Sequence, residues 1–170
     1  MPEKKTIERA RQAKREGKAP TTQAGEFVKE EIEHIREGKH GARSTKQAIA
    51  IGLSKARHAG VKLPPPKKGK TSARTRRSAE AAYRQGQSGH RPKPNPRRSK
   101  AITEALQREG RQAASSLALA RQAKEQARLR SAEERSEIAR KAARTRLAHQ
   151  THEERSAIAR KAARTRLAKT

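Results

Sequence analysis

The sequence predicts an all-α protein that is only partly folded, and three observations lead to this fold class. Apolar residues recur at helical spacing between capping residues, hydrophobic residues make up only 31% of the chain, and one Phe and one Tyr are its only aromatic residues. Globular domains usually contain roughly 45–50% apolar residues. A chain this poor in apolar surface cannot offset the ordering of its whole backbone. We therefore expect local helices, at most one small packed unit and long mobile stretches.

The charge of the chain favours polyanionic partners. There are 44 Lys and Arg against 17 acidic residues, all of them Glu, so the net charge is +27. A positive field of this size attracts DNA, RNA or an anionic membrane face. The absence of cysteine excludes disulfides and thiolate metal sites. No apolar run is long enough for a membrane span or a signal peptide, so we expect an intracellular, soluble chain.

Residues 1–60 are expected to form a helical N-terminal unit with a helical hairpin at 21–60. In its first helix Ala24, Phe27, Val28, Ile32 and Ile35 share one side, Thr21 or Thr22 can cap the start, and Gly38 can end it. In the second helix Ser44 and Gln47 form a capping box, Ile49, Gly52, Leu53 and Ala56 form a stripe, and Gly60 followed by Val61 suits a Schellman ending. This pair is the one plausible small core.

Residues 61–99 are expected to form a flexible, basic, Pro-rich linker. The stretches "KLPPPKKGKTSARTRRS" and "GQSGHRPKPNPRRSK" hold six of the eight prolines, and only Glu80 is acidic between residues 61 and 100. Basic Pro-rich sequence is typically extended and solvated. A short helix around residues 78–85 is the expected interruption.

The rest of the chain is expected to be helical. Residues 100–130 are predicted to form a helical segment that Gly110 divides into two helices. Residues 131–170 repeat a 20-residue unit, "SAEERSEIARKAARTRLAHQ" and then "THEERSAIARKAARTRLAKT". Each unit opens with a capping box, Ser131 with Glu134 and Thr151 with Glu154, and then becomes basic.

The repeats lack the pattern of helices that pack in a bundle. On a helical wheel Leu147 lies opposite Ile138, while Arg140, Lys141 and Arg144 share an arc of roughly 100°. A helix of about 17 residues extends about 25 Å, and duplex DNA carries a charge every ~1.7 Å. Phosphate contact therefore explains the repeats better than packing does. The predicted nucleic-acid-binding residues are Lys67, Lys68, Lys70, Arg74, Arg76, Arg77, Arg97 and Arg98 in the linker, and Arg140, Lys141, Arg144, Arg146, Arg160, Lys161, Arg164 and Arg166 in the repeats.

No catalytic, metal or cofactor site is predicted. Phe27 and Tyr83 are too few for the stacking platforms of RRM or OB modules. The six histidines have no Cys or Asp beside them and no HExxH pattern, so they are interpreted as ordinary surface residues. The Gly-Lys-Thr of "PPPKKGKTS" lacks the glycine spacing and the preceding strand of a phosphate loop. We therefore expect no enzymatic activity.

Three resemblances accompany these patterns. The stretch Ser44–Ala56, "STKQAIAIGLSKA", resembles the Ser-x-Lys-Gln-Ala-Ile-Ala-Ile-x-Leu-Ser-x-Ala core of small bacterial proteins of unknown function, a likeness that extends over about residues 1–85. Arg135–Lys141 is similar to an Arg-x-x-Ile-Ala-x-Lys-Gly-Gly element of bacterial stress-associated proteins, with Ala142 and Ala143 in place of the glycines. The composition after Val61 is similar to linker-histone tails and bacterial histone-like proteins. These resemblances imply a bacterial source and no established activity.

The expected function is sequence-independent DNA binding by phosphate neutralisation, as in a nucleoid-associated or histone-like protein of the bacterial cytoplasm. RNA or ribosome association is the nearest alternative. A scaffold whose N-terminal hairpin binds a protein partner is a second alternative, motivated by the apolar stripes of residues 21–60. Membrane binding is not expected, because the basic helices lack an inserting face of Trp, Phe or Leu.

Overall fold

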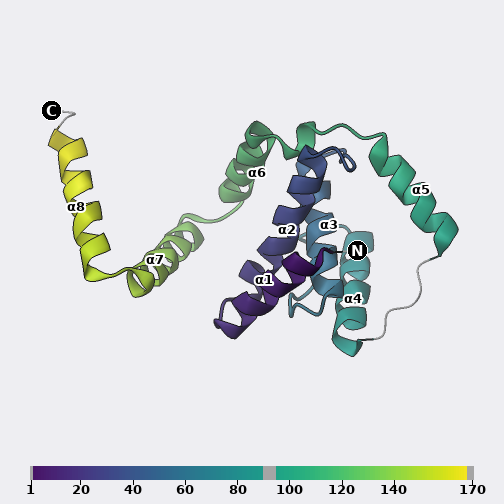
Figure 1. Ribbon diagram of the computed structural model, residues 1–170, viewed down its shortest axis with the longest axis horizontal. Coiled ribbons are helices and arrows are strands. Elements are labelled where there is room, and N and C mark those ends of the chain that lie inside the picture. The colour runs from purple at the N-terminus through teal and green to yellow at the C-terminus, as the bar shows by residue number, and fades with distance from the viewer. Residues whose placement is uncertain (1, 90–94, 168–170) are drawn as a thin grey trace. The chain divides into compact units, whose positions relative to one another are not determined.

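The computed structural model describes residues 2–89 and 95–167, and every element in these ranges is helical (Figure 1). Residues 90–94 of the expected linker and 168–170 of the second repeat lie outside the described residues. The chain divides into two compact units, residues 1–122 and 123–170. The elements are α1 (Lys4–Arg15), α2 (Pro20–Arg36), α3 (Thr45–His58), α4 (Ala73–Ser88), α5 (Pro96–Gln107), the 3₁₀ turn η1 (Gln112–Ala114), α6 (Ser116–Arg128), α7 (Ala132–His149) and α8 (His152–Leu167).

The core of the first unit lies among α1, α2, α3 and α4, which pack in chain order, α1 on α2, α2 on α3 and α3 on α4 (Figure 1). One apolar cluster surrounds Phe27, which is fully buried. A second surrounds Ile35 near the end of α2. The first contains Ala10, Ala24, Phe27, Ala56, Val61 and Leu63, and the second contains Ile32, Ile35, Ala42, Ala48, Ala113 and Ala114.

Helix α2 carries the predicted apolar face but begins earlier than predicted. Ala24, Phe27, Ile32 and Ile35 are buried, as their spacing indicates. The predicted threonine cap is wrong, because the helix begins at Pro20 with Ala19 at the N-cap and no side-chain cap. Proline suits this first helical position, where its fixed φ is already helical and its missing N–H is not needed.

Helix α3 has the predicted cap, the predicted ending and a close contact with α2. The Ser44 hydroxyl accepts from the backbone N–H of Gln47 (3.2 Å), but the capping box is incomplete, because the Gln47 side-chain oxygen accepts from the N–H of Arg43 (2.8 Å) and not from that of Ser44. At the other end the Val61 N–H donates to the Ala56 carbonyl in the Schellman pattern (3.1 Å). A Cβ placed on Gly52 would lie 2.6 Å from the Cα of Val28. Glycine is therefore what allows the two backbones to approach here.

The flexible linker expected over residues 61–99 is not confirmed for its first part. Helix α4 spans 16 residues rather than the short stretch expected at 78–85, and Ala79 and Ala82 are buried in it. A Cβ on Gly86 would lie 1.8 Å from the carbonyl oxygen of Arg57, so α4 meets the end of α3 backbone to backbone. Val61 and Leu63 are also buried. The basic composition concealed a small-residue face of alanine and glycine that packs on α3.

The segment between α5 and α6 returns to the loop between α2 and α3. The Gly41 N–H donates to the Leu106 carbonyl (2.8 Å) and the Ala42 N–H to the Gly110 carbonyl (3.1 Å). Thr45 Oγ1 donates to the Ala113 carbonyl (2.8 Å), and Arg36 Nε to the Ala114 carbonyl (2.9 Å). Residues 106–114 thus complete the N-terminal core, which was not predicted.

In the second unit α7 and α8 are separate helices that expose their side chains. Residues 132–148 and 152–167 are exposed except for the half-buried Ser156. Ser131 and Glu134 form a reciprocal capping box, as do Thr151 and Glu154 (2.9 and 3.2 Å). The predicted helices and their capping boxes are confirmed, and these helices contribute no residue to the apolar core of the described structure.

Candidate nucleic-acid interface

The predicted binding residues between residues 61 and 99 lie on a loop and at two helix starts. Lys67, Lys68 and Lys70 are exposed on the loop that joins α3 to α4. Arg74, Arg76 and Arg77 follow in the first two turns of α4, and Arg97 and Arg98 in the first turn of α5. All of them are exposed except Arg76, which is half-buried and pairs with Glu80.

The cations at the starts of α4 and α5 lie at the positive end of each helix dipole. Neither helix has an acidic residue in its first turn. Arg74, Arg97 and Arg98 are therefore placed where a cation lowers helix stability and an anion raises it. The free backbone N–H groups of a helix start also favour phosphate. A polyanion at either position would relieve an unfavourable local field.

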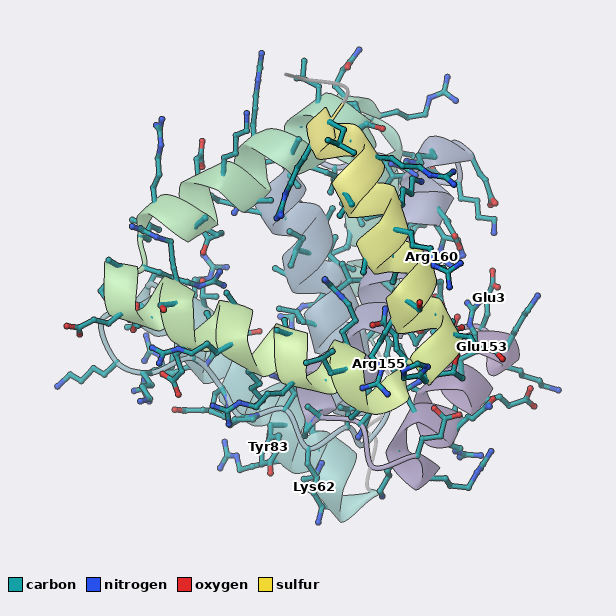
Figure 2. All side chains as sticks on the ribbon, turned by 90° about the vertical axis from the view of Figure 1, so that its left-hand side faces the viewer. Glu3, Lys62, Tyr83, Glu153, Arg155 and Arg160 are labelled. Carbon is teal, nitrogen blue, oxygen red and sulfur yellow. The ribbon has the colours of Figure 1, made fainter. Side chains whose placement is uncertain are left out.

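The predicted cations of the repeats are arranged differently but are equally accessible. Helices α7 and α8 place acidic residues in the first turn, Glu133 and Glu134 in one and Glu153 and Glu154 in the other. The cations follow along the helix, where the dipole no longer opposes them. Arg160 projects from the α8 ribbon in Figure 2, as does Arg155. All eight predicted residues are exposed: Arg140, Lys141, Arg144, Arg146, Arg160, Lys161, Arg164 and Arg166.

The described cations of the repeats also lack acidic partners among the described residues. Among the described residues, no ion pair uses a Lys or Arg of α7 or α8. In the N-terminal helices, by contrast, Arg9 pairs with Glu26 (3.2 Å) and Lys55 with Glu31 (2.6 Å). Phosphate could therefore bind the cations of the repeats without first displacing a carboxylate.

One arginine of the N-terminal unit is structural instead. Arg57 is buried and donates from Nε to the Leu63 carbonyl (3.2 Å) and from Nη2 to the Pro64 carbonyl (3.3 Å). Burial lowers the pKa of its guanidinium from the ordinary value. This arginine holds the chain after α3 and is not available to a ligand.

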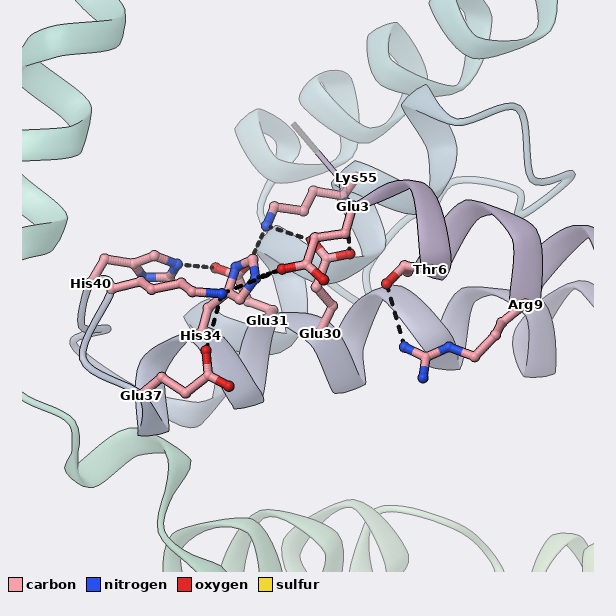
Figure 3. A network of polar contacts seen from close by, with 10 residues as sticks. Glu3, Thr6, Arg9, Glu30, Glu31, His34, Glu37, His40 and Lys55 are labelled. Carbon is pink, nitrogen blue, oxygen red and sulfur yellow. Dashed lines mark hydrogen bonds and ion pairs between the residues drawn. The ribbon is translucent and has the colours of Figure 1, made fainter.

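A polar cluster that the sequence did not predict lies at the end of α2 (Figure 3). Glu31 is buried, while His34 and His40 are partly buried, and one ligand-type atom from each lies within 4.8 Å of the others. Glu3 bonds to His34 Nε2 (2.9 Å), and the hydrogen bonds from His34 and Lys39 lower the pKa of Glu3. The interpretation of the histidines as ordinary surface residues is wrong for His34 and His40, which are partly buried in this cluster. The Glu31-x-x-His34 spacing, which places both side chains on one helix face, was the available signal.

The comparisons with known proteins match the N-terminal part of the chain alone. A family described as "Family of unknown function (DUF6496)" matches residues 4–68. This agrees with the expected resemblance to an uncharacterised family and covers less than the expected 1–85. No curated protein and no solved structure matches the chain.

No helix among the described residues is both long enough and apolar enough to span a membrane.

Proposed function

We propose that this protein binds nucleic acid, DNA in the first place, without reading base sequence. Its exposed lysines and arginines contact phosphates and release the condensed counterions. The observation that supports the proposal is that α7 and α8 are basic and exposed over their described length, and that no described Lys or Arg of theirs forms an ion pair. We infer that it acts as a histone-like protein in the bacterial nucleoid.

Two similar basic helices joined in one chain bind a polyanion with higher affinity than two separate helices would. Each helix supplies four predicted contact residues, and the second helix binds at the high local concentration that the first creates. Ile138, Leu147 and Ile158 are about half exposed, so tertiary packing does not stabilise these helices in the free protein. We infer that polyanion binding strengthens their helical structure.

The burial of the hairpin's apolar residues favours nucleic-acid binding over the scaffold alternative. The apolar stripes on residues 21–60 motivate that alternative, and in them Phe27 and Ile35 are fully buried while Val28, Ile49 and Leu53 are half-buried. Residues 113 and 114 cover the second cluster, and Val61 and Leu63 join the first. RNA remains the nearest alternative ligand, because the same phosphate contacts serve both nucleic acids.

A salt titration of the full chain tests the proposal. Affinity for duplex DNA is measured from low to moderate salt for the wild type and for a variant with Arg140, Arg144, Arg160 and Arg164 changed to Gln. The variant should show a shallower slope of log affinity against log salt, by roughly 0.9 for each of the four lost contacts. Structured RNA of equal length at equal salt distinguishes the two nucleic acids.

The matched control removes the same charge elsewhere. Lys4, Lys5, Arg11 and Lys14 are exposed on α1, outside the proposed interface, and are changed to Gln together. This variant should keep a slope much closer to that of the wild type. Equal losses in the two variants would show that net charge alone governs binding and would remove α7 and α8 from the interface.

A further inference from the structure

We propose that Glu31, His34 and His40 bind a first-row transition-metal dication, with Zn²⁺ as the ion that fits them best. Glu31 and His34 lie one turn apart on α2, and His40 comes from the loop that follows it (Figure 3). Their ligand atoms lie within 4.8 Å of one another. Two imidazoles and one carboxylate form a donor set that suits Zn²⁺, with a water molecule as the fourth ligand.

One distance in the cluster already matches a metal site. Zinc bonds to nitrogen and carboxylate oxygen are about 2.0–2.1 Å long, so adjacent ligands of a tetrahedral site lie about 3.3 Å apart. His40 Nε2 lies 3.4 Å from Glu31 Oε1. An ion can bridge these two atoms with little movement of either side chain.

The hydrogen bond at Nδ1 of His40 determines whether Nε2 of the neutral ring carries a proton. His40 Nδ1 lies 3.1 Å from the Gly41 carbonyl oxygen, which can only accept, so Nδ1 carries a proton. In the neutral ring Nε2 then presents a lone pair toward the Glu31 carboxylate. Two acceptors that face each other need a proton or a metal ion between them. A backbone carbonyl on the far nitrogen is also the usual partner of a metal-bound histidine.

The charge balance around Glu31 leaves room for a cation. Its side chain is fully buried, and neither carboxylate oxygen accepts a hydrogen bond within the described residues. Lys55 Nζ lies 2.6 Å from Glu31 Oε2 and 3.4 Å from Oε1 of Glu30, which is also buried. One ammonium thus serves two buried carboxylates, which are costly to bury without full compensation. These three groups carry a net charge of −1, which a metal cation on Glu31 Oε1 would offset.

Metal binding at this position would stabilise the docking of a distant segment. His40 adjoins Gly41 and Ala42, whose N–H groups hold the Leu106 and Gly110 carbonyls. An ion shared by α2 and His40 fixes the loop that carries these donors. We therefore expect Zn²⁺ to raise the melting temperature of the full chain.

The test uses full-length protein freed of nucleic acid by high salt and of metals by chelation. Zn²⁺ is titrated by calorimetry, and Co²⁺ is used as a spectroscopic probe. We expect binding to saturate at one equivalent of Zn²⁺. We also expect Co²⁺ to show the visible absorption of a four-coordinate ion with nitrogen and oxygen ligands. His34→Ala and His40→Ala should each weaken Zn²⁺ binding at least tenfold, while His152→Ala, which alters an exposed histidine on α8, should leave the affinity unchanged.

A fourth variant reverses the expected effect. Lys55→Gln removes the competing ammonium, so Zn²⁺ should bind more tightly than in the wild type and should raise the melting temperature by a larger amount. Its metal-free form is expected to melt earlier.

Three results would overturn the proposal. One is the absence of saturable binding to the wild type. The others are unchanged affinity in a His40→Ala variant whose circular dichroism shows it to be folded, and weaker binding in Lys55→Gln. The Co²⁺ spectrum of the wild type decides the matter even if an alanine variant fails to fold.

Discussion

Helices α2 and α7 have nearly the same length, 17 and 18 residues, and opposite environments. Helix α2 buries Phe27 and Ile35 completely, whereas Ile138 and Leu147 of α7 are 49% and 53% exposed. In α2 the apolar residues fall on one side, and in α7 they lie on opposite sides. A local start signal defines each helix, Pro20 in α2 and the Ser131 capping box in α7, but only a one-sided apolar pattern gives a helix a face that can pack.

The same contrast separates the uses of charge in the two regions. In the N-terminal unit Lys55 and Arg9 pair with glutamates, and Arg57 binds backbone carbonyls. In α7 and α8 the cations have no acidic partner among the described residues. Charge stabilises the fold in the first region, while in the second it lies on exposed side chains.

The largest expected difference comes from the same substitution in the two helices. Ile35→Ala removes a fully buried side chain and should lower the free energy of unfolding by about 2–5 kcal/mol. Ile138→Ala alters a half-exposed side chain and should change it by less than about 0.5 kcal/mol. Denaturant unfolding of each variant measures its free energy of unfolding. Similar losses at the two positions would mean that α7 packs in solution.

A smaller effect is expected at the crossing of α2 and α3. Gly52→Ala places a Cβ 2.6 Å from the Val28 Cα, so the helices must separate, at a cost of about 1–3 kcal/mol. Gly25→Ala on α2 is the matched control, since its Cβ meets nothing within 4 Å, and it should stabilise the protein by up to about 1 kcal/mol. The unfolding midpoints of the two variants, measured by heat and by denaturant, should therefore shift in opposite directions from that of the wild type. A shift in the same direction would show that the crossing is looser than described.

The smallest effect concerns the helix caps. Ser131→Ala and Ser44→Ala each remove a side chain that accepts a backbone N–H at a helix start, a loss of about 1 kcal/mol in either case. Because α7 has no packing to retain it, Ser131→Ala should lower the helical circular dichroism of the free protein. Ser44→Ala should keep its helix and lower only the unfolding midpoint. If α7 were packed, Ser131→Ala would also keep its helical circular dichroism and lower only the unfolding midpoint.

The extent to which sequence predicted the structure differs between local and distant features. The hairpin helices α2 and α3, the repeat helices, the Ser44 and Ser131 caps, the ending at Gly60 and the apolar face of α2 depend on groups within one or two turns, and each is predicted. The Thr21 or Thr22 cap was wrong because Pro20 already starts the helix. The exposure of the predicted binding residues also followed from sequence, with Arg76 as the half-buried exception.

Three features could not be predicted from local sequence. The packing of α4 on α3 depends on Gly86 meeting the Arg57 carbonyl across 29 positions, and no local period reports it. The cluster of Glu31, His34 and His40 depends on the path of the loop after α2. Residues 113 and 114 reach the second apolar cluster by the same kind of distant contact.

By itself the sequence determined the helices of the hairpin and of the repeats, the Ser44 and Ser131 caps and the net positive charge, because hydrogen bonds within a turn and net charge are local or additive properties. Only the tertiary structure decided which basic segment is packed and which is exposed, and which acidic and imidazole groups meet. Those outcomes depend on how closely backbones approach and on which buried charges are left to share one partner.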